Sequence, residues 1–194
     1  MINNQEIQWD FVSCYLAGPI DYAKDSGVGW RLEITDKLIK MGFAKHNIFD
    51  PTSKPYVSGG QSLSDEQKLM HKYREQKNWK NLEELMGQIM AVDLRLVDKS
   101  DILIVNMDGI DKTVGTIHEI VLAKIAHKPV YLIEARGKEH VSAWLMKLVG
   151  HERIFSSIDE VVEELTRIKL RGPWTTRDHK EYKIFDLNRK DFDE

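Results

Sequence analysis

Short apolar runs of strand length alternate along this chain with segments whose apolar residues recur at helical spacing. The expected strands are 11–18, 47–51, 102–107, 130–133 and 154–156. The expected helices are 29–41, 82–97, 116–127, 140–150 and 157–168. Because neighbouring parallel strands need a crossover of helix length, this alternation predicts an α/β fold with a five-stranded parallel sheet and helices on both faces.

The length of 194 residues suits one domain, since chains of this size bury roughly 70% of the surface that they expose when unfolded. We assign that domain to residues 1–168. Residues 51–80 are polar and aromatic without a sustained period, which is typical of a functional or lid-like loop, and part of this segment is expected to be helical. The tail 169–194 has no core periodicity, so we expect an extended arm that docks its aromatic residues on a neighbour. These aromatics are Trp174, Tyr182 and Phe185.

Composition and charge exclude several classes of protein. The net charge is −3 with mixed signs, so the chain lacks the basic field with which proteins bind a nucleic acid polymer. The single cysteine, Cys14, lies inside an apolar run and is expected in the core, which fits a reducing compartment. No apolar run approaches the length of a membrane span, and residues 1–11 do not resemble a signal peptide. We therefore expect a cytoplasmic protein that binds neither a membrane nor a nucleic acid polymer.

The sequence lacks the common motifs for cofactors and metals. The segment "GIDKTVGT" does not have the Gly-Lys-Thr order of a phosphate-binding P-loop, and "AGPIDYAKDSGVG" does not have the spacing of a dinucleotide fingerprint. His118 adjoins Glu119, but no second histidine stands four residues away on the same helix face, so a zinc site is not expected. No G-x-S-x-G segment offers a serine nucleophile. The sequence predicts a site that works without a metal or a cofactor.

Ligands of parallel α/β sheets bind beyond the carboxyl ends of the strands, where we expect the loops at 18–29 and 108–115 and the loop after the strand 130–133. The second of these loops leads into Gly115, Thr116 and Glu119. We expect Glu119 in the first turn of its helix, where the helix dipole favours an ionised carboxylate. Thr116 is expected to be the N-cap, and Gly115 would let a ligand approach the backbone. An ionised carboxylate can act as a nucleophile, although capping is the commoner role for a residue in this position.

Asp93 and Tyr15 are two further candidates, and each has an ordinary explanation. Asp93 interrupts the apolar stripe of the helix at 82–97, and a solvated helix face would account for it. Tyr15 lies in the first strand just before "LAG", where a half-buried aromatic residue is common. Position alone does not assign either residue to a site.

Four motifs in order resemble the nucleoside 2-deoxyribosyltransferase family. They are "YLAGPI" from Tyr15, "DLRLVDKSDILIV" from Asp93, "GTIHEI" around Glu119, and "KPVYLI" from Lys128, and the match extends over 12–168. The resemblance implies a flavodoxin-like or Rossmann-like α/β subunit that acts on a small deoxynucleoside or its 5'-monophosphate. It also implies a homo-oligomer in which a neighbouring subunit completes each active site.

The resemblance assigns roles to three residues. Glu119 matches the nucleophile that attacks the anomeric carbon, Asp93 the carboxylate that handles the leaving base, and Tyr15 the phenol that orients the nucleophile. The reaction uses these groups because breaking an N-glycosidic bond develops positive charge on the sugar and requires a proton for the departing base. The expected substrate-binding residues are Gly18, Pro19, Ile20, Asp21, Asp108, Thr113, Gly115, Thr116 and Ser142, the last from the neighbouring subunit.

The family includes nucleoside transferases and hydrolases of nucleoside 5'-monophosphates, and the flanking residues point both ways. Thr113 resembles the phosphate-binding serine of the hydrolases, at a position where the transferases carry an acid. Ser142 resembles a hydroxyl that the hydrolases contribute across a subunit boundary. Asp21 instead stands where the hydrolases have an arginine, and it would repel a phosphate unless Arg31 or Lys24 compensates. The sequence leaves open whether the substrate carries a phosphate and whether water or a second base accepts the sugar.

Two other functions remain as alternatives. A phosphoribohydrolase that releases a base from a ribonucleotide also uses a Gly-Thr-x-x-Glu pattern, but this chain lacks the Pro-Gly-Gly lead-in of that family's phosphate cradle. A non-catalytic nucleotide sensor or scaffold would keep the fold without needing a nucleophile, and the presence of Tyr15, Asp93 and Glu119 together argues against it. No motif fixes the base that is recognised or the size of the oligomer.

Overall fold

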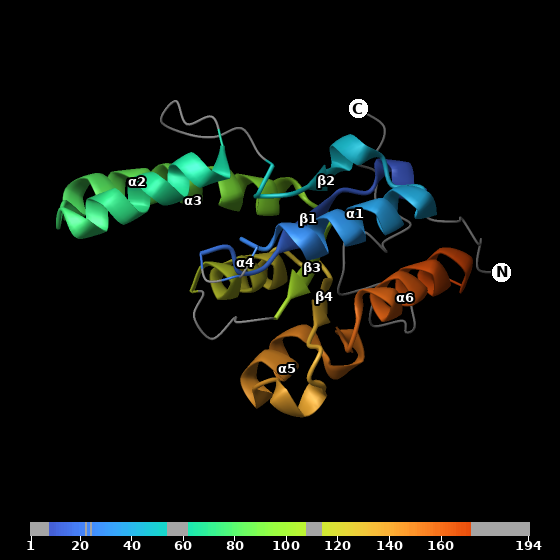
Figure 1. Ribbon diagram of the computed structural model, residues 1–194. Coiled ribbons are helices and arrows are strands. Elements are labelled where there is room, and N and C mark those ends of the chain that lie inside the picture. The colour runs from blue at the N-terminus through green and yellow to red at the C-terminus, as the bar shows by residue number, and fades with distance from the viewer. Residues whose placement is uncertain (1–7, 22, 24, 54–61, 108–113, 172–194) are drawn as a thin grey trace.

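A single parallel sheet forms the centre of the computed structural model, which describes residues 8–21, 23, 25–53, 62–107 and 114–171 (Figure 1). Its strands are β1 (Cys14–Ala17), β2 (Ile48–Phe49), β3 (Ile102–Asn106), β4 (Val130–Ile133) and β5 (Ile154–Phe155). They lie in the order β2-β1-β3-β4-β5, and every neighbouring pair is parallel. The fold is α/β and flavodoxin-like, so the predicted fold class is confirmed.

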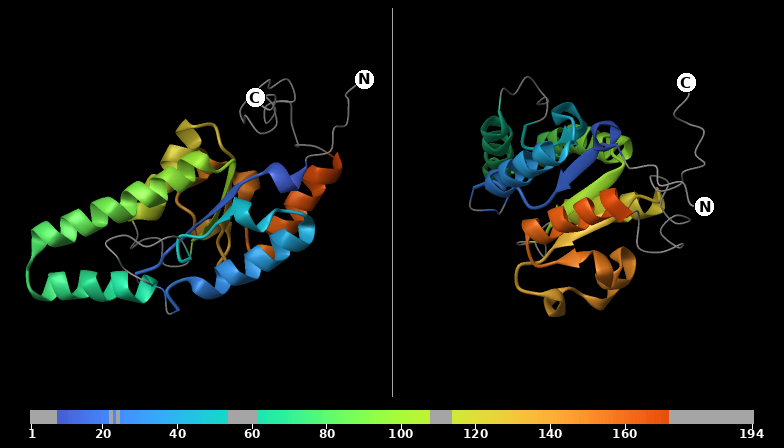
Figure 2. Two further views of the ribbon diagram at one scale, coloured as in Figure 1. Left: turned by 90° about the horizontal axis from the view of Figure 1, so that it is seen from above. Right: turned by 90° about the vertical axis from the view of Figure 1, so that its right-hand side faces the viewer.

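Helices cover both faces of this sheet, as predicted. The α-helices are α1 (Val28–Met41), α2 (Leu63–Glu75), α3 (Trp79–Lys99), α4 (Val114–Ile125), α5 (Ala143–Val149) and α6 (Ile158–Arg171). Short 3-10 helices are η1 (Trp9–Phe11), η2 (Lys45–Asn47), η4 (Lys138–His140) and η5 (His151–Arg153). Helices α1 and α6 pack on one face of the sheet, and α3, α4 and α5 pack on the other (Figure 2).

The alternation of side chains along the strands divides the core between these two faces. In β1, Cys14 and Leu16 pack toward α1 and α6, whereas Tyr15 and Ala17 pack toward α3, α4 and α5. All four residues are fully buried, which confirms that Cys14 is a core residue. Tyr15 therefore lies on the same side of the sheet as α4, the helix that carries Glu119.

Two element boundaries near the ends of the predicted domain differ from the prediction. The first strand begins at Cys14 instead of residue 11, because Trp9–Phe11 forms the 3-10 turn η1. Helix α6 continues to Arg171, so residues 169–171 belong to the helix and not to an arm. The rest of the predicted arm, 172–194, lies outside the described residues.

The segment 51–80 contains a helix, as expected. The side chain of Ser62 accepts a hydrogen bond from the amide of Asp65 at the start of α2, and Asn78 caps α3 in the same way. Helices α2 and α3 run antiparallel and project beyond the edge of the sheet (Figures 1 and 2). No described helix combines the length and the apolar character that a membrane crossing requires.

β1 and β3 are neighbours in the sheet, but the chain leaves them toward opposite faces. Helix α1 follows β1 on one face, and α4 follows β3 on the other. In open parallel sheets a ligand crevice forms at such a point, because the two connections diverge there. Gly18 and the first turn of α4 lie at the carboxyl ends of β1 and β3, where this crevice is expected.

Candidate functional site

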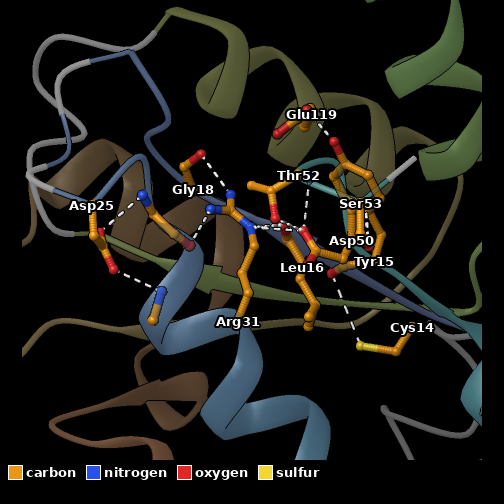
Figure 3. A network of polar contacts seen from close by, with 12 residues as sticks. Cys14, Tyr15, Leu16, Gly18, Asp25, Arg31, Asp50, Thr52, Ser53 and Glu119 are labelled. Carbon is orange, nitrogen blue, oxygen red and sulfur yellow. Dashed lines mark hydrogen bonds and ion pairs between the residues drawn. The ribbon is translucent and has the colours of Figure 1, made fainter. Parts of the chain in front are cut away.

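Tyr15 and Glu119 form a hydrogen bond near the carboxyl end of β1. The phenol oxygen of Tyr15, in the middle of β1, donates to Oε1 of Glu119 at 2.7 Å (Figure 3). Tyr15 is fully buried, and Glu119 is 8% exposed. A short bond from a buried phenol to a carboxylate fixes the orientation of that carboxylate. The structure thus brings together two of the three residues predicted to be catalytic.

The environment of Tyr15 keeps its phenol protonated. Burial raises the pKa of Tyr15 well above its ordinary value, and the nearby carboxylates of Glu119 and Asp93 raise it further. The buried cation of Arg31 acts in the opposite direction but does not reverse the shift. Because a neutral phenol is a hydrogen-bond donor, Tyr15 stays a donor to Glu119 throughout the physiological pH range.

Glu119 lies deeper in its helix than predicted. Helix α4 includes Val114 and Gly115, so Glu119 is the sixth residue from Val114 and is not in the first turn. Thr116 is a buried residue within the helix and is not its N-cap. These two predictions were wrong, because the helix starts before Thr116. The prediction for Gly115 agrees with the open space beside it, since a Cβ added there would meet no atom within 4 Å.

Tyr15 and Glu119 both line a cavity of about 320 Å³, which we call the Glu119 pocket. Its wall comes from the end of β1, the turn after β2, the α2–α3 pair and the start of α4. The lining residues are Tyr15, Gly18, Ile20, Asp21, Pro51, Leu63, Glu66, Met70, Met86, Ile89, Asp93, Val114, Gly115, Thr116 and Glu119. Most of the predicted substrate-binding residues are therefore neighbours of the predicted catalytic ones.

Asp93 reaches this pocket because one face of α3 is turned toward it. Met86, Ile89 and Asp93 follow one another at spacings of three and four residues, so they share that face. Asp93 is only partly exposed, which differs from the solvated helix residue that its position alone suggested. The pocket thus holds Tyr15, Asp93 and Glu119 together, a proximity that the helix pattern did not provide.

Carboxyl groups dominate the polar part of the pocket. Asp21, Glu66, Asp93 and Glu119 line it, and its described lining residues include no lysine, arginine or histidine. Asp21 has a counter-charge in Arg74 of α2, whose Nη2 lies 3.8 Å from its Oδ2. These surroundings favour a neutral ligand with hydrogen-bond donors over an anionic one.

Arg31 does not offer a charged surface to a phosphate, although it was one of two residues considered for that role. Its side chain is fully buried, and backbone carbonyls and Asp50 surround its guanidinium (Figure 3). The other residue, Lys24, lies outside the described part of the chain. Asp108 and Thr113 also lie outside it.

Two predicted residues are described but do not line the pocket. Pro19 is buried beside the end of β1. Ser142 is the N-cap of α5, where its Oγ accepts a hydrogen bond from the amide of Leu145 at 3.2 Å. Within one chain Ser142 therefore has a local capping role, and its contribution to a neighbouring subunit stays a prediction.

A second cavity, of about 600 Å³, lies between α4 and α5 beside Ser142. Val114 lines both cavities and is 84% exposed, as is Trp144 on α5. Together with Ile117, these two residues form an exposed apolar area that we call the α4–α5 surface. Exposed apolar areas of this kind are typical of contact sites. The α4–α5 surface adjoins the Glu119 pocket through Val114.

The sequence interpretation gave no role in the site to Glu66 and no structural role to Arg31. Glu66 is 2% exposed and lines the pocket. Arg31, Ile34 and Leu38 recur at spacings of three and four residues, and all three are buried. This spacing was the signal that Arg31 lies on the inner face of α1. A charged residue on the apolar face of a helix indicates a buried polar network.

The described residues contain no group of three or more His, Cys, Asp or Glu side chains that could hold a metal ion.

No protein-family model and no curated protein matches this sequence. Fourteen chains of solved structures match its fold. One is the crystal structure of a conserved protein from Enterococcus faecalis V583, with a TM-score of 0.52 and 15% sequence identity. That match covers 80% of this chain and 98% of the other. The likeness shows a shared fold.

Proposed function

We propose that this protein cleaves the N-glycosidic bond of a 2'-deoxynucleoside or its 5'-monophosphate and passes the deoxyribosyl group to a second base or to water. The observation that carries the proposal is the hydrogen bond from Tyr15 to Glu119 in a pocket that also contains Asp93. An oriented carboxylate beside a second carboxyl group suits the two steps of a retaining glycosyl transfer. The resemblance of the motifs to the nucleoside 2-deoxyribosyltransferases agrees with this arrangement.

In the first step a carboxylate oxygen of Glu119 attacks C1' of the sugar. The bond between C1' and the base nitrogen breaks, and the base leaves with the bonding electron pair. Asp93 supplies the proton that the departing nitrogen takes up. Positive charge develops on the sugar during this step, and the ionised Glu119 stabilises it before forming the covalent ester. Tyr15 holds the carboxylate in place by its hydrogen bond.

In the second step the ester is broken by an acceptor that attacks from the face that the base has left, opposite Glu119. A water molecule or the ring nitrogen of a second base attacks C1', and Glu119 leaves as a carboxylate. Asp93, deprotonated in the first step, takes the proton that the acceptor loses. The enzyme returns to its starting protonation state, and no redox partner is needed.

We also propose that the working form is a homo-oligomer. The α4–α5 surface adjoins the Glu119 pocket at Val114, and Trp144 on that surface is 84% exposed. A second copy that covers this surface would bury apolar area next to the site and bring its own Ser142 near the pocket. This arrangement supports the shared active site that the family resemblance implies.

The proposal is tested by trapping the covalent intermediate. Wild-type protein incubated with a 2-deoxy-2-fluoro nucleoside analogue should gain the mass of the fluorinated sugar, and Glu119→Ala should not. Glu164→Gln is the matched control, because Glu164 pairs with Arg167 on α6, on the other face of the sheet. It should form the adduct like wild type. An adduct of undiminished yield in Glu119→Ala would remove Glu119 as the nucleophile.

A second measurement separates the enzyme from a nucleotide sensor. Deoxynucleosides and their monophosphates are incubated with the protein, with and without a second free base, and the products are separated by chromatography. Release of base without the acceptor indicates hydrolysis, and exchange only in its presence indicates transfer. Binding without either product would favour the sensor and contradict the proposal.

A further inference from the structure

Arg31 is a fully buried cation, and each of its three guanidinium nitrogens donates a hydrogen bond to a backbone carbonyl. Its Nε donates to the carbonyl of Leu16 at 3.1 Å, Nη1 to Gly27 at 2.7 Å and Nη2 to Gly18 at 2.9 Å (Figure 3). Leu16 lies in β1 next to Tyr15, and Gly18 and Gly27 mark the two ends of the segment between β1 and α1. One side chain thus joins the strand that carries Tyr15 to both ends of the loop beside the pocket.

Asp50 links the guanidinium of Arg31 to a second part of the pocket wall, the turn after β2. Its Oδ1 lies 3.6 Å from Nε of Arg31 and accepts hydrogen bonds from the amide and the hydroxyl of Thr52, at 2.8 Å and 2.7 Å. Between these two residues, Pro51 lines the Glu119 pocket. The guanidinium therefore connects the turn after β2 to the loop after β1, and both contribute to the pocket wall.

The backbone at Gly27 is shaped to accept this side chain. Gly27 has φ +70°, and a Cβ added there would lie 2.3 Å from Nη1 of Arg31 and 2.4 Å from the carbonyl oxygen of Pro19. Only glycine leaves room for the guanidinium at this position and adopts this conformation without strain. Gly27 thus leaves the space that the guanidinium of Arg31 occupies.

The charge of Arg31 acts on the groups proposed to be catalytic. Burial lowers the pKa of Arg31, while the carboxylates of Asp50, Glu119 and Asp93 favour its charged form. An arginine stays protonated in proteins, so the buried positive charge is permanent. Since the interaction is mutual, the cation also favours the ionised form of neighbouring carboxylates.

We propose that Arg31 is a positioning residue of the Glu119 site, which fixes the β1 loop and the Asp50–Thr52 turn and supplies the buried positive charge that helps to keep Glu119 ionised. The first of these roles depends only on geometry. The second rests on the proposed function, because it concerns the nucleophile. The titratable groups that line the pocket with Glu119 are Tyr15 of β1, Asp21 after β1, Glu66 of α2 and Asp93 of α3. Arg31 of α1 interacts with Glu119 electrostatically, and Asp50 after β2 is the counter-charge of Arg31. His118, next to Glu119 in α4, is exposed.

The positioning role is tested by hydrogen–deuterium exchange of the amides in 16–29 and 48–53. Arg31→Lys keeps the charge, but one ammonium group cannot reproduce the forked contacts to three carbonyls. Both Arg31→Lys and Arg31→Gln should therefore exchange these amides at least about tenfold faster than wild type, a change that corresponds to about 1.4 kcal/mol. Unchanged exchange in both variants would overturn this role.

Arg153→Gln is the matched control for the exchange experiment. Arg153 is also buried, but it pairs with Glu152 beside β5, at the opposite edge of the sheet from β2. Its loss should leave the amides in 16–29 and 48–53 unaffected. If Arg153→Gln accelerated them equally, general destabilisation would explain the result and the positioning role would be wrong.

The charge role is tested by the ionisation of Glu119, followed through its carboxyl ¹³C chemical shift as pH is lowered. The signal is assigned by its absence in Glu119→Gln. Arg31→Gln should move the midpoint upward by about half a pH unit or more, whereas Arg31→Lys should stay near wild type. Asp50→Asn keeps an oxygen for Thr52 and removes a negative charge, so it should move the midpoint downward.

This measurement needs no turnover, so it can fail independently of the proposed function. If wild type never releases a base but the midpoints shift as stated, the function is wrong and the role of Arg31 stands. If wild type is active and Arg31→Gln and Asp50→Asn both titrate like wild type, the charge role is overturned. Should Arg31→Gln not fold, Asp50→Asn decides, and a midpoint that does not move downward in this variant overturns the charge role. Hydrogen exchange of the amides in 48–53 must stay as in wild type, because loosening that exposes the buried Glu119 to water would also move the midpoint downward.

Discussion

Tyr15 in β1 and Glu119 in α4 are 104 positions apart in the sequence, yet they meet in a 2.7 Å hydrogen bond inside one pocket. The contact joins the sheet to the helix that follows β3, at the place where the connections after β1 and β3 diverge. Both residues occur in motifs that resemble one enzyme family. Under the proposed function, this hydrogen bond orients the carboxylate of Glu119 in the pocket that also contains Asp93.

Tyr15→Phe should lower kcat/KM by roughly 10- to 100-fold, because a hydrogen bond to a charged group contributes about 1.5–3 kcal/mol. Phenylalanine fills the same space, so the Tm should change little. The pKa of the Tyr15 phenol is raised, so the wild-type pH profile should show no alkaline limb from this group up to pH 10. Steady-state kinetics across pH would check both points. Activity equal to wild type in Tyr15→Phe would contradict the orienting role.

Asp93→Asn should slow the release of the base by roughly 10²- to 10⁴-fold while leaving ligand binding largely intact, since the change removes a proton donor and preserves size. Substrates with leaving groups of lower pKa need less protonation, so their loss of rate should be smaller. Single-turnover rates with a series of leaving groups measure this. An equal loss for every leaving group would contradict proton donation by Asp93.

The role of Thr113 as a phosphate ligand is tested by comparing a deoxynucleoside with its 5'-monophosphate. If its hydroxyl binds the phosphate, Thr113→Val should lose about 1.5–3 kcal/mol of binding to the anion, which is at least about tenfold in kcat/KM. The unphosphorylated nucleoside should be affected little. Equal losses on both substrates would identify the protein as a nucleoside enzyme, in agreement with the carboxyl-rich lining of the pocket.

Subunit sharing is tested by mixing two inactive chains. Ser142→Ala and Glu119→Ala protomers, unfolded together and refolded, should recover part of the activity on a monophosphate, because some mixed sites contain both intact residues. Trp144→Glu on the α4–α5 surface should lower the mass measured by analytical ultracentrifugation, since a charge there opposes apolar contact. Full activity in a Trp144→Glu monomer would show that one chain builds the whole site.

Cys14 offers a prediction about stability alone. Burial raises the pKa of its thiol far above the ordinary value of 9.0, so the thiol stays neutral in the folded chain when it ionises in the unfolded one. A raised pKa contributes stability below pH 9 that is lost as pH rises further. The free energy of unfolding should fall more steeply above pH 9 in wild type than in Cys14→Ala. Urea titrations at several pH values measure this, and identical slopes would contradict it.

The sequence predicted the fold well because a parallel sheet with both faces covered needs continuous apolar strands. β1, β3 and β4 are such runs, and nearly all of their residues are buried. Turn residues such as Gly42 marked the helix ends clearly: Gly42 has a positive φ and ends α1 as its C-cap. These signals are local, so one sequence was enough to read them.

The site was less predictable, because it depends on contacts between distant segments. The local sequence pattern did not show whether α4 begins at Thr116 or at an earlier residue. The predicted position of Glu119 in its helix was wrong as a result. The proximity of Asp93 to Glu119 depends on where the α2–α3 pair directs α3, which no local rule specifies. Glu66 was missed because the segment 51–80 shows no sustained apolar period, and Arg31 because the apolar residues around it indicated only a buried helix face.

The projecting α2–α3 pair separates one part of the pocket lining from the elements that form the folded core. Tyr15 and Glu119 are anchored in the sheet and its covering helix, so their geometry depends on the folding core. Leu63, Met70 and Met86, by contrast, line the pocket from helices that extend past the edge of the sheet. Residues there can be exchanged, or the hairpin lengthened, with little loss of core packing. Under the proposed function, such a division would allow the choice of base to diversify through α2 and the first half of α3, while Tyr15, Asp93 and Glu119 stay unchanged.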